Sequence, residues 1–218
     1  MAPYLTVLME GRAEQTIERS RFIGYAAPAR TVLECECFFD RIRREHRQAT
    51  HNVPAYALGE GGRLQWAGDD GEPRGTSGAP IVHMLVQEGI SDVAVMVARY
   101  FGGVKLGKGG LVRAYTGTAK LALADAGLGK VSELLMLGVK VSYTGYNRLE
   151  AAAGGAFTIN NAVFAEEVTV SLICEPELKD IVVKQTLAVC QSASFVTERL
   201  ERVVTALTER RHNDKIVG

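Results

Sequence analysis

Residues 93–98 form an unbroken apolar run, Val-Ala-Val-Met-Val-Ala, near the middle of the chain. A run of this kind is typical of a β-strand that is covered on both faces. It is followed by a glycine-rich stretch from Arg99 to Gly110, and then by a helical pattern that ends at Gly127. The pattern therefore predicts a strand, a tight loop and the N-terminus of a long helix in direct succession.

Before this strand, the apolar pattern predicts four strands and two helices. Thr31 and Glu34 have the spacing of a capping box, in which each side chain binds the backbone N–H of the other residue. Ser77 is in the position to cap the second helix. The elements expected are two strands within 13–28, a helix from 31 to about 48, a strand at 52–58, a turn at 59–62, a strand at 64–67 and a helix from 77 to 89.

The pattern restarts after Gly127, where residues 127–130 end the helix and predict a linker. The later elements give the order βαββαβ, which is that of a ferredoxin-like fold. They are a strand from 137, a helix capped by Asn147, strands at 157–163 and 168–174, a helix from Pro176 to Val189 and a strand within 195–205.

We therefore predict an α/β (α+β) protein with two independently folded domains. The first takes residues 1–133 and the second residues 134–208, and a polar tail follows at 209–218. A chain of 218 residues is long enough for one large domain or two small ones, and the restart of the pattern favours two.

Charge limits the partners that this chain can have. The sequence holds 25 Lys and Arg against 25 Asp and Glu, so that binding of nucleic acid through bulk positive charge is excluded and only a local patch remains. We expect no sequence-specific DNA binding. No apolar run is long enough to span a membrane and no secretion signal is evident, so we expect a cytoplasmic protein without a membrane partner.

The four cysteines, Cys35, Cys37, Cys174 and Cys190, show no metal-binding or redox spacing. We interpret them as buried free thiols, and we expect no metal and no cofactor.

The glycine-rich stretch suits an anion. Gly102, Gly103, Gly107, Gly109 and Gly110 allow the backbone to come close to a ligand, and the helix that follows directs N–H groups and a positive dipole end at the same point. The cations expected to take part are Arg99, Lys105 and Arg113. Residues 102–108 also have the spacing of a phosphate loop, but glycine at 109 supplies no hydroxyl for magnesium, so we interpret that match as accidental. The alternative is a tight turn whose glycines serve packing alone.

A second loop, residues 69–75, carries three carboxylates: Asp69, Asp70 and Glu72. They are able to hold a divalent cation, or to act with His51 as general base. The structural alternative is that Asp69 forms a turn, Glu72 pairs with Arg74 or Arg113, and His51 binds the backbone.

Three groups of residues resemble the signature of the YigZ/IMPACT family. They are Ser20–Ile23 with Thr50–Asn52, Asp69–Pro73 with Gly75–Gly78, and Arg99–Gly103 with Leu106–Gly107 and Gly109–Tyr115. The remainder of the chain resembles the second domain of the bacterial members. The chain departs from the family pattern at Val53, Arg74, Ala79 and Lys108, so no role is carried over to those four positions.

The resemblance implies a first domain with the fold of ribosomal protein S5 domain 2, and a second domain similar to the last domain of elongation factor G. It also implies that the two glycine-bearing loops line one surface depression. Eukaryotic relatives bind the activator of a kinase that phosphorylates a translation initiation factor. They carry a different domain beside the shared one, so that role does not transfer to this chain.

Three functions of different classes follow. The first, which we adopt, is a non-enzymatic regulatory protein linked to translation that binds RNA, the ribosome, a translation factor or a small anion such as a phosphate ester. The second is an enzyme acting on a phosphorylated or carboxylated small molecule between the loops, although no nucleophile signature is present. The third is a protein-interaction regulator. The predicted ligand-binding residues are His51, Asp69, Asp70, Glu72, Arg99, Gly102, Gly103, Lys105, Gly107, Gly109, Gly110 and Arg113.

Overall fold

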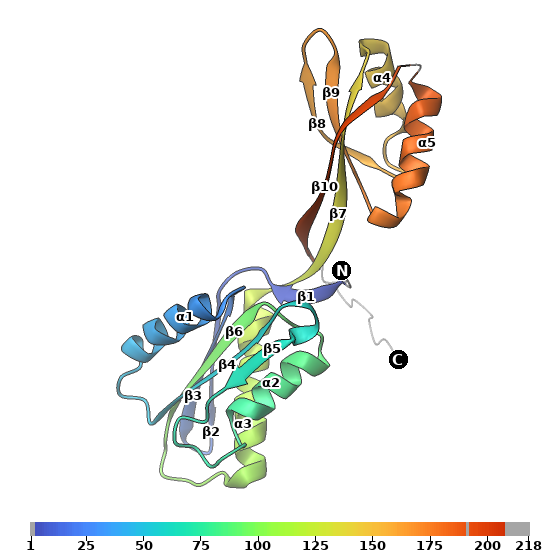
Figure 1. The fold of residues 1–218 in the computed structure, drawn as a ribbon. Helices are drawn as coiled ribbons and strands as arrows, with labels where there is room; N and C mark the ends of the chain where they lie inside the picture. The colour runs from blue at the N-terminus through green and yellow to red at the C-terminus, as the bar shows by residue number, and fades with distance from the viewer. Residues whose placement is uncertain (1–2, 191, 208–218) are drawn as a thin grey trace, which may run out of the picture. The chain divides into compact units, whose positions relative to one another are not determined.

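The computed structural model describes residues 3–190 and 192–207, and the predicted α/β class is confirmed (Figure 1). The chain divides into two compact units. The N-terminal unit holds the described residues up to Val131 together with residues 204–207, and the C-terminal unit holds Ser132–Val203. The polar tail predicted at 209–218 lies outside the described residues.

The N-terminal unit is built on an antiparallel five-stranded sheet. Its strand order is β2 (Gly11–Ile17), β3 (Ser20–Pro28), β6 (Val93–Tyr100), β4 (His51–Leu58) and β5 (Leu64–Ala67). β6 is the central strand, and residues 93–98 are 0% exposed, which confirms the prediction from the apolar run. A short 3-10 turn, η1 (Glu60–Gly62), joins β4 to β5.

Helices cover both faces of this sheet (Figure 1). α1 (Val32–Glu45) packs on one face, and α2 (Gly78–Gln87) and α3 (Gly107–Ala126) pack on the other. Successive side chains of a strand point to opposite faces, so Met96 contributes to the α1 core while Val95 and Val97 contribute to the core under α2 and α3.

Two helix caps of the N-terminal unit differ from the prediction. The Thr31 Oγ1 atom accepts a hydrogen bond from the Glu34 N–H at 3.2 Å, but the Glu34 carboxylate accepts from the Arg30 N–H at 2.6 Å, so the capping box is only half formed. The Ser77 side chain does not cap α2. Asp69 takes that role, because its Oδ1 atom accepts from the Gly78 N–H at 3.1 Å and from the Ser77 hydroxyl at 2.6 Å.

The linker predicted at 127–130 is wrong. Gly127 does end α3, with a φ of 68°, but the following residues begin β7 (Leu128–Val141). The start of β7 pairs with a strand that the sequence analysis missed, β1 (Tyr4–Val7). A strand of four residues gives too short a pattern for its alternation to be read, and its pairing partner lies more than a hundred residues away.

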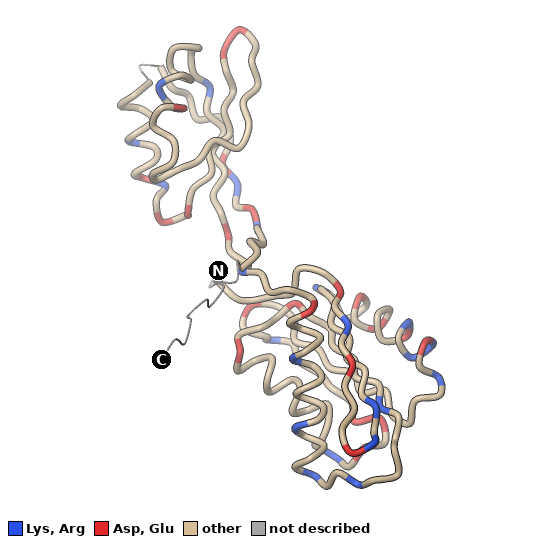
Figure 2. Tube along the Cα trace, turned by 180° about the vertical axis from the view of Figure 1, so that it is seen from behind, with Lys and Arg blue, Asp and Glu red and all other residues tan. Residues whose placement is uncertain are grey.

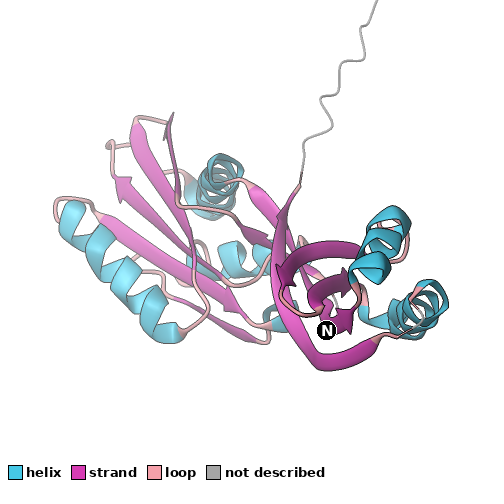
Figure 3. Cartoon of the chain, turned by 90° about the horizontal axis from the view of Figure 1, so that it is seen from above, coloured by secondary structure: helices cyan, strands magenta, loops and turns pink. Residues whose placement is uncertain are grey.

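The C-terminal unit follows the order βαββαβ. It contains most of β7, then α4 (Tyr143–Ala152), β8 (Thr158–Phe164), β9 (Val168–Cys174), η2 (Pro176–Leu178), α5 (Lys179–Val189) and β10 (Ser194–Ala206). Strand β7 lies between β9 and β10, with β8 next to β9, and the two helices lie on one side of the strands (Figure 3). Ser142, and not Asn147, caps α4. The kinship of either unit to particular ribosomal or translation-factor domains stays a prediction.

Three of the cysteines, Cys35, Cys174 and Cys190, are buried and free, as expected. Cys37 is exposed on α1, so the prediction of burial is wrong for that residue. No helix among residues 3–190 and 192–207 is both long enough and apolar enough to cross a membrane.

Candidate functional site

A cavity of about 470 Å³ lies where the two glycine-bearing loops meet the starts of β4 and α3 and the end of β6. The antiparallel pairing of β4 with β6 places His51 opposite Arg99, which brings residues far apart in the sequence to one edge. The lining residues are Thr50, His51, Gly71, Glu72, Pro73, Arg99, Phe101, Lys105, Leu106, Gly107, Lys108 and Leu111.

A buried ion pair forms one wall of this cavity. The Arg99 Nη1 atom donates to Glu72 Oε1 at 2.6 Å, and the Tyr115 hydroxyl donates to the same oxygen at 2.7 Å. Arg99 and Glu72 are only 4% and 8% exposed. The pair therefore joins the carboxylate loop to β6 and cancels its own charge, so that it adds no net charge to the cavity.

The sequence analysis named Arg74 or Arg113 as the alternative partner of Glu72, and the partner is Arg99. Burial, followed by the hydrogen bond to the Glu72 carboxylate, raises the pKa of Tyr115, so its hydroxyl is a donor at neutral pH. The Arg99 guanidinium lies 5.3–5.4 Å from two ring centroids, those of Phe22 and Phe101. Its Nε atom is buried and has no hydrogen-bond partner among the described residues.

His51 faces the same wall. Its Nδ1 atom lies 2.7 Å from the carbonyl oxygen of Asp70, and its Nε2 atom lies 3.8 Å from Glu72 Oε1. A carbonyl oxygen only accepts, so the Nδ1 atom of His51 carries the proton of this hydrogen bond. The two ring nitrogens of His51 therefore both lie near oxygen atoms of the carboxylate loop.

The other two predicted carboxylates, Asp69 and Asp70, accept hydrogen bonds from neighbouring parts of the protein. Asp70 Oδ2 accepts from the Asn52 N–H at 2.5 Å. Burial would raise the pKa of Asp69, but the hydrogen bonds from Ser77, Gly75 and Gly78 outweigh it and hold that pKa below its usual range. Within the described part of the chain, no group of three or more His, Cys, Asp or Glu side chains is placed to hold a metal ion.

The glycines of the cationic loop serve different purposes. A Cβ atom on Gly102 would lie 1.9 Å from the Arg19 carbonyl oxygen, so this position requires glycine for packing. Gly103 and Gly107 have φ values of 86° and 68°, a conformation that glycine adopts without strain. On Gly110, a Cβ atom would meet the Leu106 side chain at 3.0 Å.

Gly109 differs from these four. It is exposed within the first turn of α3, and a Cβ atom there would meet only the flexible end of Arg113, at 3.7 Å. Neither packing nor backbone conformation therefore explains a glycine at this position.

The positive side of the cavity comes from α3 and the loop before it. Lys105 and Lys108 line the cavity, and both are exposed without a hydrogen bond or ion pair to any described residue. No side chain caps the N-terminus of α3, at Leu106. Arg113 lies on the exposed surface of α3 and does not line the cavity. Basic and acidic positions are otherwise interspersed along the trace, so this is a local patch (Figure 2).

The comparisons with known proteins identify the family. A model of the Impact N-terminal domain matches residues 18–123, a range that includes both loops. The IMPACT family member YvyE of Bacillus subtilis (strain 168) is 39% identical over 147 residues, which are 67% of this chain and 68% of that protein. The chain belongs to the IMPACT family.

Another IMPACT relative, YigZ of Escherichia coli (strain K12), is 34% identical over 142 residues, covering 64% of this chain and 70% of that protein. A solved structure, described as the crystal structure of an hypothetical protein, covers 96% of this chain and 99% of its own, with a TM-score of 0.58 and 25% identity. The resemblance to the YigZ/IMPACT family is thereby confirmed.

Sequence reasoning missed some residues of this IMPACT site. Tyr115 and Ser20, whose hydroxyl accepts from Arg99 Nη2 at 3.3 Å, lie within the motifs quoted above but carry no chemistry that a pattern reveals. Phe101 and Lys108 line the cavity, and their position beside the loop was the available signal. Of the predicted ligand residues, His51, Glu72, Arg99, Lys105 and Gly107 line the cavity. The other predicted residues do not line it: Asp69, Asp70, Gly102, Gly103, Gly109, Gly110 and Arg113.

Proposed function

We propose that this protein is a non-enzymatic binding protein linked to translation, and that its cavity binds a phosphate-bearing ligand, in the first place single-stranded RNA. The phosphate would lie over the first turn of α3, between Lys105 and Lys108. Helix N-termini suit anions because their first N–H groups have no partner within the helix. Membership of the IMPACT family supports the link to translation.

The exposed glycine at position 109 is the observation that carries this proposal. Glycine within a helix costs about 0.5–1 kcal/mol relative to alanine. Packing does not require a glycine at position 109, because the space beside it is open. A ligand that must approach the N–H groups of α3 closely does require a residue without a side chain there.

The exposure of Phe101 at the cavity favours a nucleotide as the ligand rather than a bare anion. Phe101 is 47% exposed at the edge of the cavity, and the guanidinium of Arg99 lies 5.4 Å from the centroid of its ring. A base stacking on an aromatic ring contributes about 1–3 kcal/mol, whatever the base. Leu106 and Leu111 add apolar lining beside it. Phosphate and base would therefore both find a partner in the cavity of about 470 Å³.

A pair of glycine variants of α3 tests the proposal. Gly109→Ala should stabilise the protein, because it removes the entropic cost of glycine, yet it should weaken binding of a fluorescent oligouridine because its methyl group occupies the ligand's space. Gly117→Ala is the matched control, since a Cβ atom there meets only Gln15 Nε2 at an ordinary 3.6 Å. It should stabilise the same helix without changing affinity. Equal affinity of the two variants would remove the argument for a ligand at position 109.

Lysine variants separate RNA from a small phosphate ester. Lys105→Ala and Lys108→Ala should each weaken binding by a few-fold, because an exposed charge at a helix N-terminus is worth about 0.3–1 kcal/mol. With RNA, the slope of log affinity against log salt should become shallower by about 0.7 for each lost phosphate contact. Arg113→Ala should change affinity less, since Arg113 does not line the cavity. If pyrophosphate binds more tightly than the oligonucleotide at each salt concentration, the ligand is a small phosphate ester.

The position of His51, which lines the cavity with its Nε2 atom 3.8 Å from Glu72 Oε1, favours one alternative, an enzyme acting on a phosphorylated small molecule with His51 as general base. Such an enzyme would convert its ligand, and His51→Gln would abolish turnover while leaving affinity nearly unchanged. For a binding protein, the oligonucleotide or phosphate ester is recovered intact after long incubation.

A further inference from the structure

The face of the N-terminal sheet that carries α1 has an aromatic surface that α1 does not cover. Leu64 and Trp66 alternate along β5 and are 49% and 48% exposed. Trp66 lies opposite Tyr56 of β4, and the two rings are stacked with centroids 5.9 Å apart. Phe39 of α1 comes only to 6.5 Å from the Trp66 ring. A cavity of about 430 Å³ remains between α1 and β5, which we call the Trp66 groove.

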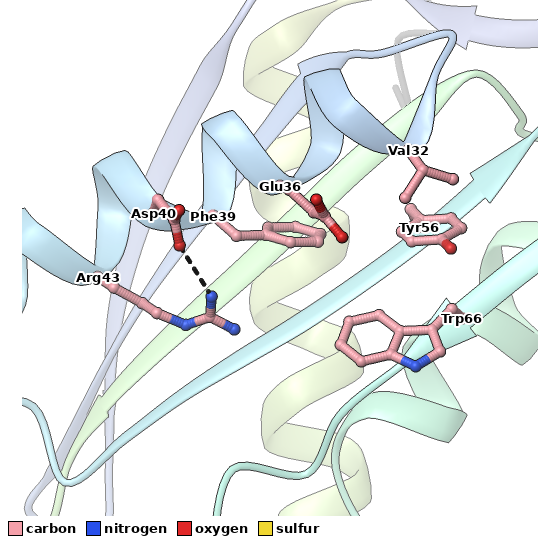
Figure 4. Close-up of a pocket in the computed structure, with 7 residues that line it drawn as sticks. All are labelled: Val32, Glu36, Phe39, Asp40, Arg43, Tyr56 and Trp66. Carbon is pink, nitrogen blue, oxygen red and sulfur yellow. Dashed lines mark hydrogen bonds and ion pairs between the residues drawn. The ribbon is translucent and has the colours of Figure 1, made fainter.

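The wall of the Trp66 groove is acidic. Glu36, Asp40 and Arg43 lie along one face of α1, beside the rings of Phe39, Tyr56 and Trp66 (Figure 4). Asp40 Oδ1 accepts from Arg43 Nη1 at 3.3 Å, so their charges offset each other. Glu36 has no hydrogen bond or ion pair with any described residue. One uncompensated carboxylate therefore lines the groove together with the half-exposed indole ring of Trp66.

The edge of β5 is a further feature of the groove. In the sheet order β5 comes last, and it pairs only with β4. Its outer backbone N–H and C=O groups thus lack a strand partner among the described residues. An edge of this kind is able to pair with an extended segment of another chain.

We propose that the Trp66 groove binds an extended, basic peptide segment of a partner protein, with an arginine or lysine side chain over Trp66 and beside Glu36. A guanidinium is attracted by the face of an indole ring and forms strong hydrogen bonds with a carboxylate. The backbone of the segment would pair with the outer edge of β5. RNA does not suit the groove, because Arg43 is paired with Asp40 and the remaining carboxylate, that of Glu36, would repel phosphates. The groove therefore adds a protein partner to the proposed RNA-binding function and does not depend on it.

The chain contains a single tryptophan, so the emission of Trp66 reports directly on the groove. The probe is a synthetic peptide of alternating threonine and valine with one central arginine, added up to millimolar concentration, and the comparison peptide carries glutamate in place of arginine. The arginine peptide should change the emission of Trp66 and protect it from quenching by acrylamide, and the glutamate peptide should do neither. An oligouridine added in excess should not displace the arginine peptide.

Variants show whether the charge of Glu36 is responsible. Glu36→Gln should weaken binding of the arginine peptide by about two- to five-fold, the size expected for one exposed charge contact. Glu18→Gln, which makes the same charge change on the turn between β2 and β3, should not alter it. With a fluorescently labelled peptide, Trp66→Ala should weaken binding by about ten-fold or more, as for an aromatic anchor, provided that its circular dichroism matches that of the parent. The proposal fails if the arginine peptide leaves Trp66 emission unchanged, if the glutamate peptide acts equally, or if Glu36→Gln and Glu18→Gln have the same effect.

Discussion

Glu72→Gln is the substitution that tests the buried centre of the candidate site most directly. Glu72 Oε1 accepts hydrogen bonds from both Arg99 and Tyr115, and the two charged side chains are only 3% and 5% exposed. Glutamine keeps the volume and one acceptor oxygen but removes the charge. The guanidinium of Arg99 is then left in a buried position without a counter-charge.

The expected cost is large. Breaking a buried ion pair by removing one partner costs about 3–5 kcal/mol. Since the amide oxygen of glutamine still accepts one hydrogen bond, we expect the lower end of that range, about 3 kcal/mol. For a folded unit of about 130 residues, each kcal/mol lowers Tm by about 4 °C. The N-terminal unit of the Glu72→Gln variant should therefore melt roughly 10 °C below that of the parent.

The emission of Trp66 is the appropriate assay, because the single tryptophan lies in the N-terminal unit and reports its unfolding. Glu14→Gln is the control: Glu14 accepts two hydrogen bonds from Arg21, at 2.6 and 2.9 Å, but on the exposed surface. Its Tm should change little, since exposed ion pairs contribute little to stability.

A double variant completes the test. Arg99→Met combined with Glu72→Gln leaves no buried charge, so it should be more stable than Glu72→Gln alone. The reasoning is refuted if Glu72→Gln and Glu14→Gln have the same Tm. It is also refuted if the double variant is less stable than Glu72→Gln.

Three further predictions concern the N-terminal unit. Burial lowers the pKa of His46, and Glu45 offsets this effect only in part, so the stability that the neutral ring provides is present above pH 6.5 and is lost as the pH falls from 6.5 toward the folded pKa. His46→Gln should flatten that part of a stability–pH profile measured by urea unfolding, and an unchanged slope would contradict the role of His46. Asp69→Ala removes the cap of α2 and should cost about 1–2 kcal/mol in urea unfolding, and an unchanged midpoint would contradict the capping role. Gly102→Ala places a methyl group against the Arg19 carbonyl oxygen and should destabilise by about 1–3 kcal/mol, whereas Gly109→Ala should not destabilise; equal melting of the two would contradict the packing role of Gly102.

Several strands of both units were predictable because their signals are local. β6 is a continuous apolar run and β9 alternates strictly, and each pattern is sufficient by itself to identify a strand. β1 and the start of β7 were not predictable, because they stabilise each other across more than a hundred residues. Gly127 was correctly identified as the end of α3, but nothing nearby shows that the following residues pair with β1.

The residue types of the candidate site were predictable from the sequence, but the role of each residue was less so. Glycines, cations and carboxylates mark both loops in the sequence, but the sequence does not say which carboxylate faces the cavity. Asp69 and Glu72 are three residues apart, but Asp69 caps α2 whereas Glu72 pairs with Arg99. That division depends on where β6 brings Arg99, which is a tertiary effect.

The fold separates the balanced charges of the sequence into local surfaces of opposite sign. Zero net charge excludes binding by a general positive field, but it does not exclude two local surfaces of opposite sign on one unit. Lys105 and Lys108 lie unpaired beside the N-terminus of α3, while Glu36 lies unpaired in the groove that Trp66 also lines. Within one small unit, the first surface would attract phosphate and repel a basic peptide, and the second would do the reverse. The opposite charges of the two surfaces therefore keep the two proposed partners from competing for one surface. A protein that carries both surfaces is expected to have a sequence of nearly zero net charge.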